Sequence, residues 1–420
     1  MVNQKFMKRI IRICLTGILL ATSGGLHAQT YLTLDSVLAV IRDRNPMLKT
    51  YRLRADAMNA YAKGADGWMA PEVGGGLWML PYRTVSDPRD KGQIMLSVQQ
   101  KITSHSRRKA NQAYMESRAG IEEASGGWVY NELKSQARAA YYQWLVLEKK
   151  KKVLVRNEGI LTMMMKINQL RYPYNQSKLS DIYKVESKLG ELKNMILMND
   201  NQAEQQNILL NQLMSLSQET RFAIDTTLSV VSFRPAPIDS SMLAQNRSDI
   251  HRIDKTILSV MYNQEVEKRQ SRPDINLSFN HMFARGEGMP NQFMLLGMVS
   301  IPIAPWSSKM YKANVEGMGR EIESMKAERT AILNEAQGMT ARLYSELNVI
   351  QRQMENYDKR ILPALRKNYE AVMLAYEENR EQLPMVLDAW EALSMMELQY
   401  LDTLQKYYET VVDYEKQIEL

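Results

Sequence analysis

Methionine is the residue type in this sequence whose abundance points to a particular chemistry. The chain has 420 residues and 29 of them are methionine. Those that cluster on predicted helices or around one predicted hairpin are Met163, Met164, Met165, Met195, Met198, Met282, Met289, Met294, Met298, Met395 and Met396. Thioether sulfur is a soft ligand that favours Cu(I) or Ag(I). Methionine is also a good helix former and gap filler in place of leucine. The metal interpretation requires several methionines to face a water-filled lumen.

The residues that usually carry catalysis are few and scattered. The four histidines are His27, His105, His251 and His281, and no Gly-rich phosphate loop or Ser/His/Asp grouping is found. We therefore expect no enzyme, no cofactor, and neither catalytic nor metal-ligating residues of the common kinds.

The N-terminal 28 residues have the layout of a secretory signal peptide. Residues 5–12 carry four basic side chains and no acidic one, an apolar run reaches Leu20, and cleavage after Ala28 is expected. The alternative is a buried helix over residues 10–20. Cleavage would lower the formal charge from +7 to +3 and remove the only cysteine, Cys14. The net positive charge of the mature chain is then too small to indicate nucleic-acid binding. Because no cysteine remains, disulfides and thiolate metal sites are excluded.

The rest of the chain contains the same sequence pattern twice, and the two copies are about 200 residues apart. Asn45-Pro46 leads through an amphipathic stretch to Pro71, and Asn246-Arg247-Ser248-Asp249-Ile250 leads through a similar stretch to Pro273. This offset is too long for a short-period solenoid. We expect residues 29–225 to form a first structural repeat, 226–240 a linker and 241–420 a second repeat. Each repeat would hold a helix, a β-hairpin and long helices.

Four segments have the alternation of β-strands: residues 73–80, 93–102, 275–282 and 293–301. Each has about the 9–11 residues that a tilted strand needs to cross a bilayer. After residue 28 no apolar run approaches the roughly 20 residues of a spanning helix. Any membrane insertion of the mature chain is therefore expected to use these strands.

The helical stretches are exceptionally long. No proline occurs between residues 106 and 169, and apolar residues recur at spacings of three and four, as in coiled coils. This helix should end near Tyr172-Pro173, and a return helix should start near Ser180. In the second repeat, a helix starting near Lys309 should be interrupted at Pro363, and a last helix should follow a break at 379–384.

Four strands are too few to close a membrane barrel, because the smallest barrels have eight and an open edge in lipid leaves backbone groups unpaired. The strand number therefore predicts an oligomer. Three chains would supply twelve strands.

In this order, and duplicated, the motifs resemble those of the TolC-like outer-membrane efflux proteins. The residues that carry the resemblance, which spans nearly all of the mature chain, are Leu32 to Leu38 before Asn45-Pro46, Asn246 to Ile250, Val299 to Ile303, Ile361-Leu362-Pro363, and Tyr376 to Ala389. The resemblance implies an α+β membrane protein with a long coiled-coil α-helical barrel and a transmembrane β-barrel, with four strands per chain and a two-fold internal repeat. It implies a homotrimer that works with a periplasmic adaptor protein and an inner-membrane pump.

The expected function is the outer-membrane exit duct of a tripartite efflux pump, which passively conducts small molecules or ions from the periplasm to the outside. Heavy-metal exporters of the Cu/Ag type use members of this family, so export of such metals is one candidate function. The alternative is a periplasmic coiled-coil adaptor or scaffold protein, which would leave the alternating hairpins unexplained. Membrane fractionation separates the two.

Family members often carry two acidic residues that narrow the entrance at the periplasmic tip. Here Asp388 matches the second, Met385 occupies the place of the first, and Asp181 lies at the related position of the first repeat. Met385 and Asp388 are three residues apart on a predicted helix, so both can face one side and present thioether and carboxylate to a soft cation. The alternative is that Met385 packs against a neighbouring helix and Asp388 is an ordinary surface acid. The tip turns usually contain glycine, which this chain replaces with Asn175 and Asn379, and asparagine also tolerates the left-handed conformation.

Overall fold

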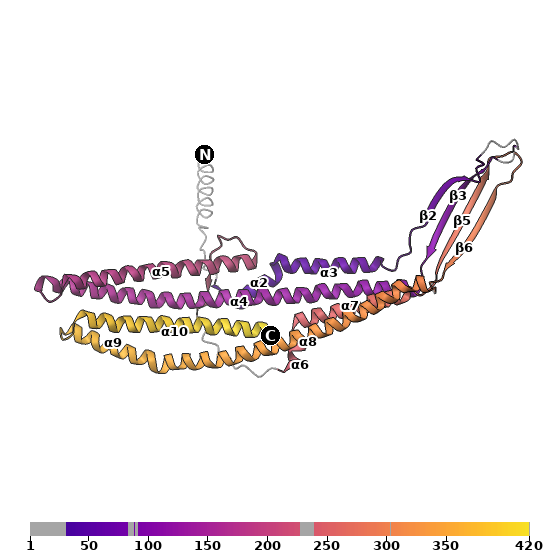
Figure 1. The fold of residues 1–420 in the computed structure, drawn as a ribbon. Coiled ribbons are helices and arrows are strands. Elements are labelled where there is room, and N and C mark those ends of the chain that lie inside the picture. Colours follow the sequence, from indigo (N-terminus) through magenta and orange to yellow (C-terminus); the bar gives the residue numbers. More distant parts are fainter. Residues whose placement is uncertain (1–30, 83–87, 89–90, 227–238, 303, 420) are drawn as a thin grey trace, which may run out of the picture. The chain divides into compact units, whose positions relative to one another are not determined.

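The computed structural model describes residues 31–82, 88, 91–226, 239–302 and 304–419. The predicted signal peptide and most of the predicted linker lie outside these residues. The described chain is mostly helical (Figure 1). The elements in chain order are β1 (Tyr31–Leu32), α2 (Leu34–Arg44), α3 (Pro46–Gly64), β2 (Glu72–Trp78), β3 (Gln93–Ile102), α4 (His105–Arg171), η1 (Tyr172–Tyr174), α5 (Leu179–Met214), β4 (Ala223–Ile224), α6 (Ser240–Asn246), α7 (Ser248–Arg269), β5 (Asp274–Ala284), β6 (Gln292–Ser300), α8 (Pro305–Asn356), η2 (Tyr357–Ile361), α9 (Leu362–Glu377) and α10 (Leu383–Ile418).

These elements fall into two compact units, and each unit draws on distant parts of the sequence. The first unit holds the described residues of Met1–Asp43, Ala137–Phe233 and Arg352–Glu409. The second holds those of Arg44–Gln136, Arg234–Gln351 and Thr410–Leu420. The two compact units therefore do not coincide with the two predicted sequence repeats. The repeats stay a prediction.

Helices α4, α5, α9 and α10 pack together to form the core of the first unit. Its buried residues recur at intervals of three, four and seven: Leu154, Leu161, Met164, Val185, Leu192, Met373, Tyr376, Leu383, Val386, Leu387 and Trp390. Such spacing places them along one seam of each helix, as in coiled coils. Among the described residues, no helix combines the length and the apolar character needed to cross a membrane.

A short parallel pairing in the first unit was not predicted. Tyr31 and Leu32 of β1 pair with Ala223 and Ile224 of β4. The hydroxyl of Tyr141, on α4, donates to the carbonyl oxygens of Leu32 (3.1 Å) and Asp225 (3.5 Å). Burial raises the pKa of Tyr141 to about 12, so this hydroxyl keeps its proton at physiological pH.

The interruption expected at Pro363 is a single π-helical turn. Tyr357–Ile361 is π-helical, and Pro363 lies at the start of α9. Proline has no N–H to donate, and its ring clashes with the carbonyl four residues earlier in a regular helix. The wider π turn accommodates this clash while the helix continues.

The second unit contains a four-stranded antiparallel sheet with the order β2-β3-β5-β6, so β2 and β6 are its edges (Figure 1). The strands overlap the four segments in which the sequence alternates. Opposed residues share a face, because side chains alternate with a period of two. Val73, Val98, Phe279 and Leu295 form one such row across the sheet.

The two faces of this sheet differ sharply in chemistry. One face is mainly apolar and exposed, and it also carries Gln100 and His281. Its exposed large hydrophobic side chains are Val73, Leu77, Ile94, Leu96, Val98, Ile275, Leu277, Phe279, Phe283, Phe293, Leu295 and Val299. The other is mainly polar and better covered. Its β3 and β5 positions include Gln93, Ser97, Gln99, Asn276, Ser278 and Asn280. We call these the apolar face and the polar face.

The N-terminus of α7 is held by side chains around the Asn-Arg-Ser-Asp-Ile motif. Arg247 donates to both carboxylate oxygens of Asp249, Nε to Oδ1 at 3.0 Å and Nη2 to Oδ2 at 2.5 Å. Arg247 Nη1 donates to the carbonyl and side-chain oxygens of Gln417. The Glu419 carboxylate accepts from the backbone N–H and the hydroxyl of Ser248, each at 3.0 Å. Helix α3 begins instead at Pro46, which has no N–H to satisfy.

Candidate functional site

The predicted entrance residues lie where α4 turns into α5 and where α9 turns into α10, which are neighbours at one end of the first unit (Figure 1). Both turns end a helix in the same way. Asn175 (φ 57°) and Asn379 (φ 64°) are left-handed. The N–H groups of Gln176 and Arg380 reach back five residues to Arg171 and Ala375. This is the Schellman arrangement, which normally uses glycine at the left-handed position. The expectation that asparagine would take this conformation is confirmed.

Substitution of Asn379 should show this backbone requirement directly. Asn379→Val should lower the free energy of unfolding by about 1–2 kcal/mol, because a β-branched residue pays the full cost of the left-handed conformation. Asn379→Gly is the control and should stay within about 0.5 kcal/mol of the parent. Urea unfolding of the purified protein measures both. Equal stability of the two variants would contradict the role given to Asn379.

A cation joins the two turns. Nη2 of Arg171, the last residue of α4, donates to the carbonyl oxygens of Tyr376 and Glu377, both at 3.1 Å. Its guanidinium also lies over the Tyr376 ring, 4.6 Å from the centroid. A cation at the last carbonyls of α9 satisfies unpaired acceptors and complements the helix dipole. Burial raises the pKa of the Tyr376 phenol, and the Arg171 charge opposes this shift.

The two turns enclose a polar cavity of about 450 Å³, which we call the turn cavity. Its lining includes Asn168, Arg171, Lys184, Glu381 and Asp181. Asp181 is half-buried in the first turn of α5, and its Oδ2 accepts the backbone N–H of Lys178 at 3.4 Å. Asp181 therefore helps to begin a helix as well as lining the cavity.

Met385 and Asp388 do not line the turn cavity. Both are exposed on the first turns of α10, and Met385 is 52% exposed. The neighbouring Val386 and Leu387 are the residues that α10 buries there. The structure thus places Met385 and Asp388 on an open helix surface of the single chain and does not bring Asp181 into one cavity with them.

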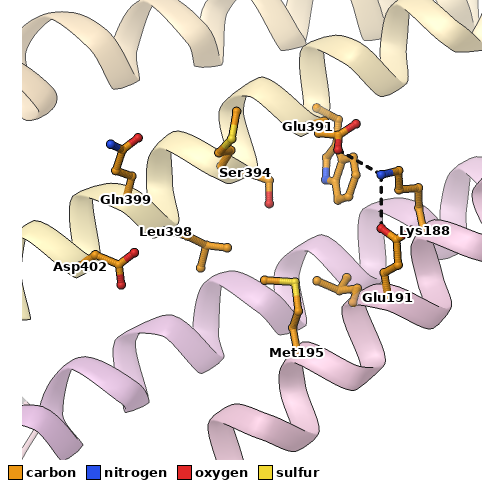
Figure 2. Close-up of a pocket in the computed structure, with 11 residues that line it drawn as sticks. Lys188, Glu191, Met195, Glu391, Ser394, Leu398, Gln399 and Asp402 are labelled. Carbon is orange, nitrogen blue, oxygen red and sulfur yellow. Dashed lines mark hydrogen bonds and ion pairs between the residues drawn. The ribbon is translucent and has the colours of Figure 1, made fainter.

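A second hollow lies further along the same helices, between α5 and α10 (Figure 2). This groove has a volume of about 520 Å³. Lys188 of α5 donates to Glu391 of α10 (3.0 Å) and to Glu191 (3.2 Å), and these hydrogen bonds raise the pKa of Lys188. Leu192, Met195, Trp390 and Leu398 add apolar surface. Met195 is itself 42% exposed, so its thioether lines an open groove of apolar and charged side chains.

Sequence reasoning missed Arg171 and the bond between Lys188 and Glu391. Arg171 carried a signal, since a basic residue in the last turn of a helix commonly interacts with terminal carbonyls. Lys188 and Glu391 are 203 positions apart, so no local pattern pairs them. Among the described residues, no three His, Cys, Asp or Glu side chains are arranged to hold a metal ion.

Comparison with known proteins gives matches in structure alone. No family model matches the sequence, and no curated protein matches it. The outer-membrane channel OprN superposes with a TM-score of 0.73 at 15% identity, covering 92% of this chain and 89% of OprN. CusC, which forms a transmembrane channel, gives 0.74 at 14% identity over 92% and 91%. A membrane protein from Pseudomonas aeruginosa gives 0.76 at 14% identity over 92% and 90%.

These likenesses extend over nearly the whole described chain and over most of each matched structure. They include both the helical unit and the unit that holds the sheet. The chain therefore has the fold of outer-membrane channels, and the predicted resemblance to the TolC-like proteins is confirmed at the level of fold.

Proposed function

We propose that this chain is a subunit of an outer-membrane exit duct for a tripartite efflux pump, and that it conducts small molecules or ions passively. The observation that carries this proposal is the sheet of the second unit. Its apolar face exposes side chains such as Phe293 (73%) and Leu295 (71%). An exposed apolar surface of this extent on a monomeric soluble protein would be a liability, whereas lipid would cover it favourably.

The two edges of the sheet support a homotrimer. The strand order leaves β2 and β6 unpaired on their outer sides. Edges of this kind cannot remain open in lipid, because each backbone group needs a hydrogen-bond partner there. Pairing β6 of one chain with β2 of the next would close a barrel, and three chains give twelve strands, an even number within the range of such barrels. The long helices of the three chains would form an α-helical barrel.

The two-fold internal repeat gains support from equivalent contacts. Asn111 and Asn314, which correspond in the repeat, each donate a side-chain hydrogen bond to the C-terminal end of the preceding helix or just beyond it. Asn111 reaches the carbonyl of Ala65 at 2.9 Å, and Asn314 reaches Glu267 at 3.0 Å. Each repeat also supplies one antiparallel hairpin and one turn with a left-handed asparagine.

A passive duct needs partners that supply energy. We propose a periplasmic adaptor and an inner-membrane pump, with the cleaved signal peptide delivering the chain to the cell envelope. The groove between α5 and α10 supports contact with another protein, because it combines exposed apolar surface with the charged pair of Lys188 and Glu391.

Fractionation and deletion test the duct against a soluble periplasmic scaffold. The protein should be found in the outer membrane as a trimer after cross-linking, and its deletion should sensitise cells to an exported compound. Recovery in the soluble periplasm as monomer or dimer would reject the duct. Unchanged tolerance of a broad panel of drugs, detergents and metals would reject the efflux role.

The entrance proposal concerns Asp388, Met385 and Asp181. Three-fold symmetry would place three copies of the exposed Asp388 around the axis, where their summed field favours cations. Asp388→Asn should then lower cation selectivity in single-channel recordings. Met385→Leu should lower copper or silver tolerance while leaving drug tolerance unchanged. Glu335→Gln, which removes an exposed acid of α8 that lines neither turn, is the charge-matched control. Parental behaviour of both variants would leave a plain duct.

Heavy-metal export is the second candidate for the cargo. The abundance of methionine and the exposure of Met385 support it. Met195, on a helix, supports it less, because its groove is also lined by Leu192, Trp390 and Leu398. The methionines of the β-strands are stronger support for heavy-metal export.

A further inference from the structure

All methionines within the four strands of the sheet lie on its polar face. They are Met95 on β3, Met282 on β5, and Met294 and Met298 on β6. The register opposes Met95 to Met282, Met294 to Asn280, and Met298 to Asn276. The exposed large hydrophobic side chains of the apolar face are valine, leucine, isoleucine and phenylalanine, and this face also carries Gln100 and His281.

This distribution differs from that of the strand leucines and phenylalanines, all but one of which lie on the apolar face. A filler chosen for its apolar character would occur among the leucines and phenylalanines of the apolar face. These methionines instead alternate with residues of that face and share theirs mainly with polar residues such as Ser97, Asn280 and Gln292, and with one leucine, Leu296. What distinguishes a thioether on a polar surface is its soft sulfur donor.

Three of the four thioethers are neighbours. Met95 and Met282 are directly opposed, a relation that places Cβ atoms about 4.5–5.5 Å apart. Met294 is diagonal to Met282, about 7–8 Å away and within reach of long side chains, because it opposes Asn280 two residues earlier. Met282 is 8% exposed, Met95 is half-buried and Met294 is 39% exposed, so the group lies partly covered with one side open.

We propose that Met95, Met282 and Met294 form a three-thioether site for a soft monovalent cation, Cu(I) or Ag(I). Thioethers select such ions over the hard cations Na⁺, K⁺ and Mg²⁺. They need not lose a proton to bind, unlike cysteine or histidine ligands. Binding should therefore vary little with pH. The proposal deepens the proposed function: in a closed barrel the polar face lines the lumen, so each chain presents this site to the conducted stream.

Silver binding to the purified full-length protein in detergent tests the site. Ag(I), supplied as the nitrate in chloride-free buffer, serves as a redox-stable probe, and isothermal titration counts the ions. The triple variant Met95→Leu, Met282→Leu and Met294→Leu should lose one tightly bound Ag(I) per chain. Met298→Leu, on the same face of β6, is the matched control and should lose none. Leucine conserves volume, so the strands should be retained.

Two further measurements complete the test. X-ray absorption at the silver edge should show sulfur neighbours that disappear in the triple variant, and the affinity of the parent should be the same at pH 5.5 and pH 7.5. Equal silver binding by the triple variant and the parent would overturn the site. A steep pH dependence, or oxygen and nitrogen neighbours alone, would also overturn it.

Failure of the site and failure of the duct have different signatures. If the triple variant still forms outer-membrane trimers and keeps drug tolerance but loses silver binding, both proposals stand. If the parent is absent from the outer membrane yet the purified chain binds silver through sulfur, the duct fails and the site stands. A parent that forms trimers but shows no silver bound through these methionines leaves the duct and removes the site.

Discussion

Val98→Arg should abolish assembly in the outer membrane, whereas Gln99→Arg should leave it largely intact. The two residues are adjacent in β3 but point to opposite faces of the sheet. Val98 is 40% exposed in the middle of the apolar row formed with Val73, Phe279 and Leu295. Gln99 opposes Ser278 on the polar face.

The size of the expected effect follows from the cost of placing arginine in lipid. Near the middle of the bilayer this cost is about 2–4 kcal/mol for each chain of a β-barrel. Three chains in one trimer would bear it together. Gln99→Arg adds the same charge to the polar face, which would line the water-filled lumen of the proposed duct and keep the charge solvated.

Electrophoresis without heating measures the fraction of each variant that forms trimers in isolated outer membranes. Drug tolerance of the cells gives a second readout. A soluble scaffold would respond differently, because an added charge on an exposed apolar face would not hinder its folding. Equal assembly of the two variants would therefore reject lipid as the environment of the apolar face.

Local patterns were enough to place most elements of this fold. The alternation of apolar and polar residues predicted the strands, and Pro363 predicted the interruption before α9. The tolerance of asparagine for the left-handed conformation predicted the backbone at Asn175 and Asn379. Each of these rests on interactions within a few residues, which a sequence displays directly. The pairing of β1 with β4 was missed because two residues on each side carry no periodicity.

The candidate sites depended on contacts that the sequence does not display. Asp181 and Met385 correspond in the predicted repeat, yet Asp181 lines the turn cavity while Met385 lies outside it. The strand methionines were visible as a cluster near the second hairpin, but Met95 was not among them. Its place opposite Met282 depends on the pairing of β3 with β5, strands that are distant in sequence.

Arg247→Ala should be among the most destabilising single substitutions in the second unit. Arg247 and Asp249 are each 12% exposed, and the pair is bidentate. Removing the arginine leaves the Asp249 carboxylate buried without its cation, which typically costs about 3–5 kcal/mol. It also removes both hydrogen bonds to Gln417, which tie the end of α10 to the start of α7.

A matched pair of variants separates burial from charge. Arg320→Ala removes an ion pair with Glu323 of similar length, 3.0 Å, but its side chains are 76% and 68% exposed. Solvent screens such a pair, so this control should change the free energy of unfolding by less than about 0.5 kcal/mol. The double variant Arg247→Ala with Asp249→Ala should recover part of the loss, because no buried carboxylate then remains unpaired. Urea unfolding followed by circular dichroism measures all three. If Arg247→Ala costs no more than Arg320→Ala, the pair around the Asn-Arg-Ser-Asp-Ile motif does not hold α7 and α10 together.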